Sequence, residues 1–150
     1  MNMSDIQQQV GVFENQLVDV FTKAPHLPQN IRDILITLAP WLALIFGILG
    51  IVSLLALGWL WVLLTIVTLG ASIWIVIHVL IGLASAGLAL WAYSGLKEGL
   101  KSGWDKLFWS QIISAIGIII SIFGSTFSGW SLIGVLIGFY LLFEIRSHYK

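Results

Sequence analysis

The chain has 150 residues, of which 59% are hydrophobic and only 9% are charged, and its formal net charge is zero. Soluble domains carry roughly 25% charged residues, so this composition excludes an ordinary globular protein, and the absence of a basic excess argues against a nucleic-acid partner. The chain contains no cysteine, which excludes disulfides, thiol catalysis and thiolate metal sites.

The first segment, "SDIQQQVGVFENQLVDVFTK", predicts an amphipathic helix, because its apolar residues recur every three or four positions. That apolar face comprises Ile6, Val10, Phe13, Leu17, Val20 and Phe21. The polar face is acidic with a lone Lys23, whereas helices that bind anionic lipid are rich in Lys and Arg. Docking against protein is therefore favoured over lipid, and both readings stay open.

Pro25 and Pro28 end this helix, so residues 1–27 are expected to form a helix and linker, and residues 28–150 a transmembrane domain. A second short amphipathic piece, with Ile31, Ile34, Leu35 and Leu38 on one face, is expected to end at Pro40. Pro suits the first turn of a helix, so the first span is predicted to begin there.

Two blocks, from Ile34 to Leu96 and between Lys106 and Glu144, contain no Asp, Glu, Lys or Arg. Since about 20 apolar residues cross a bilayer as a helix, we predict four spans at about 41–61, 73–94, 106–125 and 130–146. The expected fold is all-α, a polytopic four-transmembrane-helix bundle with an N-terminal amphipathic cytoplasmic helix. Trp concentrates where bilayer meets water, and all eight tryptophans lie near an end of these spans: Trp41, Trp59, Trp61, Trp74, Trp91, Trp104, Trp109 and Trp130.

Basic residues set the orientation, because cytoplasmic loops carry an excess of Lys and Arg. They precede the first span, separate the second from the third in "SGLKEGLKSGWDKLFW", and follow the fourth, while the connectors at about 62–72 and 126–129 have none. We therefore expect an integral protein of the cell (inner) membrane with both termini cytoplasmic. The polar, acidic start predicts no cleaved signal.

Small residues recur at three- or four-residue spacing within the spans and let helix backbones approach closely. They predict helix packing, either within the bundle or between copies of the chain. The residues concerned are Gly47 and Gly50, then Gly82, then Ser114, Gly117 and Ser121, and finally Gly134 and Gly138.

Three polar residues within or at the ends of the spans define a candidate polar path: His78, Gln111 and Glu144. His78 is the only intramembrane side chain that can change its charge near neutral pH, although the structural reading, a hydrogen-bonded histidine, is favoured. Glu144 is expected to form an interfacial salt bridge with His148, one turn further on. Gln111 and the serines form the most polar face of the third span.

No enzyme is expected. The chain has no HExxH, GxSxG or phosphate-binding glycine loop, and its three histidines are scattered along the sequence, whereas a metal site needs convergent ligands. No cofactor and no metal are therefore predicted.

The stretch "KAPHLPQNIRDILITLAPWLALIFGILG" and the final "IGFYLLFEIRSHYK" resemble a group of small four-helix bacterial inner-membrane proteins. The resemblance rests on Pro40–Trp41 and on residues 140–149. It implies a bacterial inner-membrane bundle and transfers no functional residue.

The sequence thus favours a non-enzymatic membrane protein that packs through small-residue helix faces, as a homo-oligomer or as a structural or assembly subunit beside another membrane protein. The alternative is a small transporter or channel subunit with a path along the third span. Its partners are the lipid bilayer and a second copy or another membrane protein, with no nucleic acid.

Overall fold

In a computed structural model of the chain, the structure describes residues 3–21, 25–58, 60, 63, 73–123 and 129–149. This described part contains five α-helices and no strand: α1 (Met3–Phe21), α2 (Gln29–Ser53), α4 (Ile73–Lys97), α5 (Lys101–Phe123) and α6 (Gly129–Glu144). A π-helical turn, η1 (Leu54–Gly58), continues α2, and a 3-10 turn, η2 (Arg146–His148), follows α6.

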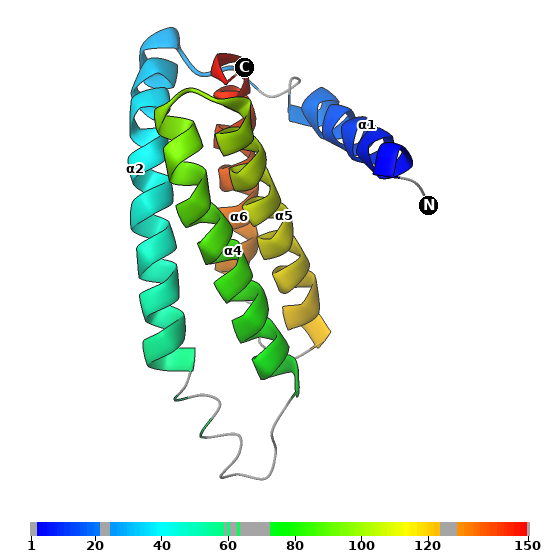
Figure 1. Cartoon of the computed structure of the whole chain (residues 1–150), viewed down its shortest axis with the longest axis vertical. Helices are drawn as coiled ribbons and strands as arrows, with labels where there is room; N and C mark the ends of the chain where they lie inside the picture. The colour runs from blue at the N-terminus through cyan, green and yellow to red at the C-terminus, as the bar shows by residue number, and fades with distance from the viewer. Residues whose placement is uncertain are drawn as a thin grey trace.

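Helices α2, α4, α5 and α6 form an elongated bundle, and α1 lies beside it on a separate axis (Figure 1). Helix α4 packs extensively on α5 and on α2, whereas α6 packs on α5 over a smaller contact. Four helical segments are long and apolar enough to cross a membrane, at Gln29–Ala56, Val76–Lys97, Lys101–Ile122 and Gly129–His148. The predicted all-helical architecture with four such segments is thereby confirmed.

The first long helix begins earlier than predicted. The amphipathic piece before Pro40 and the first span form one continuous helix, which starts at Gln29 and contains Pro40 in its interior. The prediction that the helix ends at Pro40 is therefore wrong. A proline removes only one backbone donor, and within a bundle the freed carbonyl group can be accommodated by neighbouring groups.

A short turn of residues 98–100 joins α4 to α5, and we call this end of the bundle the turn end and the opposite end the far end. Gly99 occupies the left-handed region with φ 71°, which suits glycine. Gly95 and Gly103 lie backbone to backbone: a Cβ on Gly95 would stand 2.7 Å from the Gly103 Cα, and a Cβ on Gly103 would overlap the Leu96 backbone nitrogen. These two glycines allow the helices to leave the turn in close contact.

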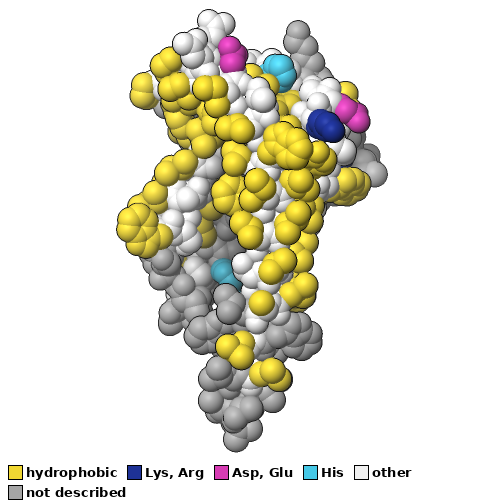
Figure 2. All heavy atoms as spheres, turned by 90° about the vertical axis from the view of Figure 1, so that its left-hand side faces the viewer, with side chains coloured by type: hydrophobic (Ala, Val, Ile, Leu, Met, Phe, Trp, Pro, Cys, Tyr) yellow, Lys and Arg dark blue, Asp and Glu magenta, His cyan; other side chains and the backbone are white. Residues whose placement is uncertain are grey.

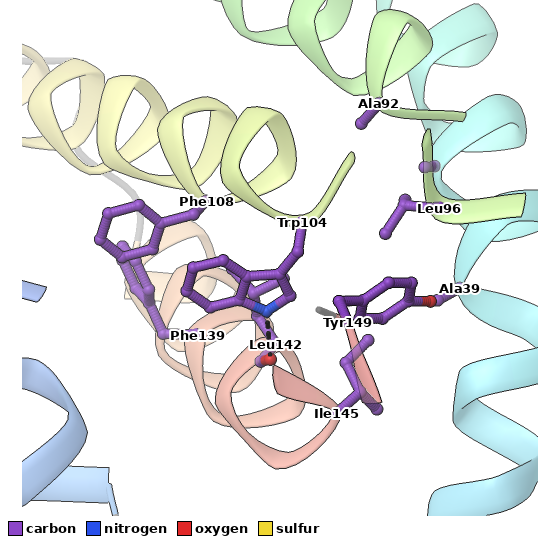
Figure 3. Packing of buried hydrophobic residues seen from close by; sticks show 10 residues of the cluster. Ala39, Ala92, Leu96, Trp104, Phe108, Phe139, Leu142, Ile145 and Tyr149 are labelled. Carbon is purple, nitrogen blue, oxygen red and sulfur yellow. Dashed lines mark hydrogen bonds between the residues drawn. The ribbon is translucent and has the colours of Figure 1, made fainter. Parts of the chain in front are cut away.

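The buried hydrophobic cluster lies toward the turn end (Figure 3). Trp104 is its centre, with only 1% of its surface exposed, and its Nε1 donates a hydrogen bond of 2.9 Å to the Leu142 carbonyl. The Trp104 ring stacks on Phe108 at a centroid distance of 5.3 Å. Trp104 is therefore a core residue, although its position near a span end suggested an aromatic anchor at the membrane surface.

The outer surface of the bundle is apolar along much of its length. On the face drawn in Figure 2, hydrophobic side chains cover most of the described surface, and the acidic and basic side chains gather at the upper end. The half of α6 nearest the far end is especially exposed, with Trp130, Leu136 and Ile137 all more than half open. Core packing and charge are thus both concentrated at the turn end.

Candidate functional site

The carboxylate of Glu144 joins the end of α6 to the linker before α2 and to the start of α2. Its Oε1 accepts hydrogen bonds from Arg32 Nη2 at 2.6 Å, Arg32 Nε at 3.2 Å and the Leu27 amide at 3.1 Å. Its Oε2 lies 3.3 Å from His26 Nδ1. The Glu144 side chain is 4% exposed and that of Arg32 is 32% exposed, so the acid is buried while the base still reaches solvent. We call these four residues the Glu144 clasp.

The predicted pairing of Glu144 with His148 is wrong. The His148 ring instead contacts Tyr149, at a centroid distance of 5.3 Å, and the partners of Glu144 come from residues more than a hundred positions earlier in the chain. A carboxylate needs several donors when it leaves water, and the linker amide and the Arg32 guanidinium supply them better than one histidine could. Sequence proximity gave no signal of this contact.

A second ion pair ties α1 to the turn end. Arg146 donates to Glu14 Oε1 from Nη2 at 2.6 Å and from Nε at 3.1 Å. The linker is fixed in the same region, because the Tyr140 hydroxyl donates to the Pro25 carbonyl. Leu17 of α1 packs against the buried cluster, whereas Val12 and Val20 stay exposed. Among the described side chains of α1, some therefore contact the bundle and others are exposed.

The small residues of the first two spans lie at the interface of α2 and α4. A Cβ on Gly47 would stand 2.7 Å from the Leu90 side chain, one on Gly50 3.1 Å from the Ala86 Cβ, and one on Gly82 2.8 Å from Leu54 Cδ1. A side chain at Gly47 or Gly82 would thus have to displace a leucine. These glycines serve packing within the chain.

The small residues of the third and fourth spans differ among themselves. A Cβ on Gly117 would stand 3.1 Å from the Ile81 side chain, and one on Gly138 would stand 2.5 Å from Gln111 Nε2. Gln111 therefore lies over Gly138, between α5 and α6. Gly134, one turn away, has no described atom within 4 Å of its Cβ position and is exposed. Gly138 is used inside the chain, and Gly134 is free on its outer face.

Three serines form a hydrogen-bonded cluster between α4 and α5. Ser110 donates to the Ser85 carbonyl at 2.8 Å, and Ser114 donates to the Ser110 carbonyl at 3.0 Å. The Ser85 hydroxyl lies 2.7 Å from the Ser114 hydroxyl and 3.0 Å from the Ser110 carbonyl. Ser121 is buried and donates to the carbonyl of Ile118, within its own helix. The cluster provides the interhelical polar contacts that the serines of the third span suggested.

Two cavities follow the α4–α5 interface. The central one, of about 380 Å³, is walled by α2 and α6 and floored by the serine cluster and Gln111. The second, of about 390 Å³, lies nearer the far end and is lined by His78, Ser121 and Ser131. Gly82 and Ser114 line both cavities, so these residues mark the junction between them. We call the two cavities together the crevice.

Toward the turn end, the crevice borders the buried cluster. Leu142 and Ile145 line the central cavity and also belong to the buried cluster that contains Trp104. Of the predicted polar path, the crevice brings together Gln111 and His78, together with Ser114 and Ser121. Glu144 lines neither cavity and belongs to the clasp instead. His78 makes no hydrogen bond to another described residue. The predicted role of His78 as a hydrogen-bonded structural residue is therefore not seen among the described residues.

Sequence reasoning missed two features of the site. The backbone contact of Gly95 with Gly103 lies within the charged stretch that we interpreted as a loop, and the paired glycines around that turn were the available signal. The Arg146–Glu14 pair was also missed. The only signal for it is that these residues lie in segments both expected on the cytoplasmic side.

Among the described residues, no group of three or more His, Asp or Glu side chains converges in a way that could hold a metal ion. No protein-family model, no curated protein and no solved structure matches this chain. The resemblance to small bacterial inner-membrane proteins therefore stays an expectation from the two quoted stretches, and function has to be argued from the clasp and the crevice.

Proposed function

We propose that the chain is a non-enzymatic integral protein of the cell (inner) membrane, with both termini cytoplasmic and with the crevice as a path for a small solute or ion. It is then a small transporter or channel subunit. Four apolar helices support insertion. The basic residues at the turn end, which include Arg32, Lys101 and Arg146, support the orientation through the positive-inside rule.

The observation that carries the proposal is the crevice itself. Intramembrane cavities lined by hydroxyl and amide groups give a solute polar partners where lipid gives none. Here Ser85, Ser110, Gln111 and Ser114 line one cavity, His78 and Ser121 line the next, and Ser114 lines both. An inert helix pair would fill this space with apolar side chains to native packing density.

The path is tested by flux through liposomes that contain the purified protein, with proton, potassium and chloride movement followed separately. We expect at least one ion to cross in the wild type. Ser114→Leu fills the junction of the two cavities and should abolish that flux. Ile116→Leu is the matched control, since Ile116 lies on the same helix, is exposed and lines neither cavity. Absence of wild-type flux for all three ions rejects this path.

His78→Ala distinguishes a proton relay through His78 from a path along the serine hydroxyls. If His78 relays protons, the substitution removes proton flux and leaves other fluxes intact, because imidazole titrates near neutral pH. Robust proton flux in His78→Ala excludes the relay and leaves the serine hydroxyls as the route.

Orientation is tested with single cysteines, which can be introduced freely because the chain has none. Gly129→Cys at the far end should react with an impermeant thiol reagent in intact cells. Glu98→Cys, in the turn, should react only after the cells are permeabilised. The reverse pattern places the turn end outside.

A structural or assembly subunit is the second candidate, and the exposed Gly134 favours it. Because no described residue lies within 4 Å of its Cβ position, this glycine could meet a helix of a second copy or of another membrane protein. Gly134→Ile should then lower the oligomer mass in detergent while the monomer stays folded. An unchanged oligomer mass would indicate that this face of α6 contacts lipid.

Helix α1 is proposed to serve as an amphipathic cytoplasmic contact in either case. Its docking through Glu14 and Leu17 supports protein contact, and its acidic polar face disfavours anionic lipid. Release of α1 by Arg146→Gln should make residue 15 more accessible to proteolysis without dissociating the four long helices.

A further inference from the structure

A third cavity, of about 490 Å³, lies at the turn end, where several segments of the chain meet. Helix α1, the linker, the start of α2, the start of α5, the end of α6 and η2 each contribute to its lining. It is distinct from the crevice, since no residue lines both. We propose that this cavity binds the phosphate group of an anionic phospholipid.

The lining includes three cationic side chains. Among the described residues, Arg32, Lys101 and Arg146 line the cavity, and the one lining carboxylate is that of Glu144. Both Glu144 oxygens are already engaged in the clasp. Glu14 and Asp105 do not line the cavity, but together with Glu144 they balance the formal charge of the three cations, so the cavity offers N–H donors rather than a net positive charge.

The three cationic side chains have N–H donors beyond those that their ion pairs use. Each arginine binds its carboxylate through Nε and one Nη2 hydrogen. A guanidinium has five N–H donors, so three remain on each. The Lys101 ammonium lies 3.7 Å from Asp105, beyond a normal hydrogen bond, and its side chain is 54% exposed. Further acceptors, such as phosphate oxygens, would match these donors.

The position of the cavity near the ends of the candidate spans favours a lipid over a soluble anion. Arg32, Lys101 and Arg146 lie within a few residues of the ends of three candidate spans, which is where headgroups would lie. Trp104 and Phe143 give the same cavity an apolar wall for the part of the lipid next to the phosphate. Basic pockets between transmembrane helices on the cytoplasmic side are typical anionic-lipid sites.

The test uses the full chain in detergent micelles, so it depends on neither the orientation nor the flux proposed above. Phosphatidylglycerol and phosphatidylcholine share a phosphate diester and acyl chains but differ in net charge. We expect native mass spectrometry to show retention of phosphatidylglycerol in preference to phosphatidylcholine, together with a higher melting temperature in phosphatidylglycerol. Equal retention of the two lipids overturns the proposal.

Two lysines on α5 provide a matched pair. Lys101→Gln should weaken phosphatidylglycerol binding about fivefold, the usual effect of one basic residue near the membrane surface. Lys101→Arg should preserve binding. Lys106→Gln is the control, because Lys106 Nζ lies over the Trp91 ring, 4.6 Å from its centroid, and does not line the cavity.

Two further outcomes overturn the assignment. Equal weakening by Lys101→Gln and Lys106→Gln would mean that general surface charge, rather than the cavity, holds the lipid. Stabilisation by millimolar inorganic phosphate equal to that by phosphatidylglycerol would assign the cavity to a free anion. Lys101→Gln and Lys106→Gln both leave the ion pairs of the Glu144 clasp intact.

Discussion

The turn end and the far end of the bundle use the same helices but hold them in different ways. At the turn end, α4 and α5 meet backbone to backbone, Trp104 fills the interior, and Glu144 ties α6 to the start of α2. Toward the far end, a cavity lined by His78 and three serines occupies the interface, and α6 is largely exposed. Tight packing thus fixes one end, while the described residues toward the other end are packed less closely.

Gly103→Ala should give the largest loss of stability. Its Cβ would overlap the backbone of Leu96 and Gly95, which cannot rotate away as a side chain can. Overpacking costs typically 1–3 kcal/mol, and we expect about 3 kcal/mol or more here, measured as a lower melting temperature in detergent. Gly134→Ala at the far end is the matched control and should be neutral or stabilising by up to about 1 kcal/mol, since alanine favours helix. Similar losses at the two glycines would remove the contrast between the ends.

Glu144→Gln should come next, with a loss of about 2 kcal/mol. Breaking a buried ion pair costs roughly 3–5 kcal/mol, but Arg32 is about one-third exposed and stays partly hydrated, which lowers the cost. Chemical denaturation in detergent measures it. Glu98→Gln removes an exposed carboxylate of the same turn end and should change stability by less than about 0.5 kcal/mol. If the two variants behave alike, the clasp does not stabilise the fold.

Trp104→Phe should cost about 1–2 kcal/mol. It removes the hydrogen bond to the Leu142 carbonyl, which is worth about 1 kcal/mol, and it leaves part of the indole volume unfilled. Trp109→Phe on the same helix is the control, because Trp109 is 42% exposed. The difference in melting temperature between the two variants measures the core contribution of Trp104. Equal melting temperatures would argue that Trp104 lies at the surface.

Tyr149→Phe should have the smallest effect and the opposite sign. Among the described residues no group bonds the buried Tyr149 hydroxyl, so its removal should leave stability unchanged or raise it by up to about 1 kcal/mol. Burial also raises the pKa of Tyr149. The folded state therefore favours the neutral phenol, and its contribution is lost as the pH rises above about 10, where an unfolded tyrosine ionises. Tyr149→Phe should therefore lose less folding stability than the wild type as the pH rises above about 10. A lower stability of Tyr149→Phe near neutral pH would contradict the unbonded state of the hydroxyl.

The sequence predicted the number and type of the long helices because that information is local. Two charge-free blocks divided by one charged stretch suffice to define four apolar segments, and the structure has four. The boundaries were less predictable. Pro40 suggested a break before the first span, yet α2 continues through this proline and exposes the charged Asp33 near its start at Gln29.

The partners of the polar residues could not be predicted, because they depend on which helix ends meet. Glu144 pairs with Arg32 rather than the nearby His148, and Gln111 packs over Gly138 on the neighbouring helix. The small-residue spacing did identify helix faces, but it could not distinguish Gly138, which Gln111 covers, from Gly134, which no described residue covers. Both have the same local pattern, and only the packing of α5 against α6 separates them.

The Glu144 clasp also imposes an order on assembly during synthesis. Arg32 and Glu144 are 112 positions apart in the chain, so their contact becomes available only after α6 has been made. The α4–α5 hairpin, by contrast, brings together residues separated by a three-residue turn and can form early, since local contacts form before distant ones. In a nascent chain the α4–α5 hairpin can therefore form before Arg32 of α2 meets Glu144, and a chain interrupted before α6 would leave Arg32 without this acidic partner.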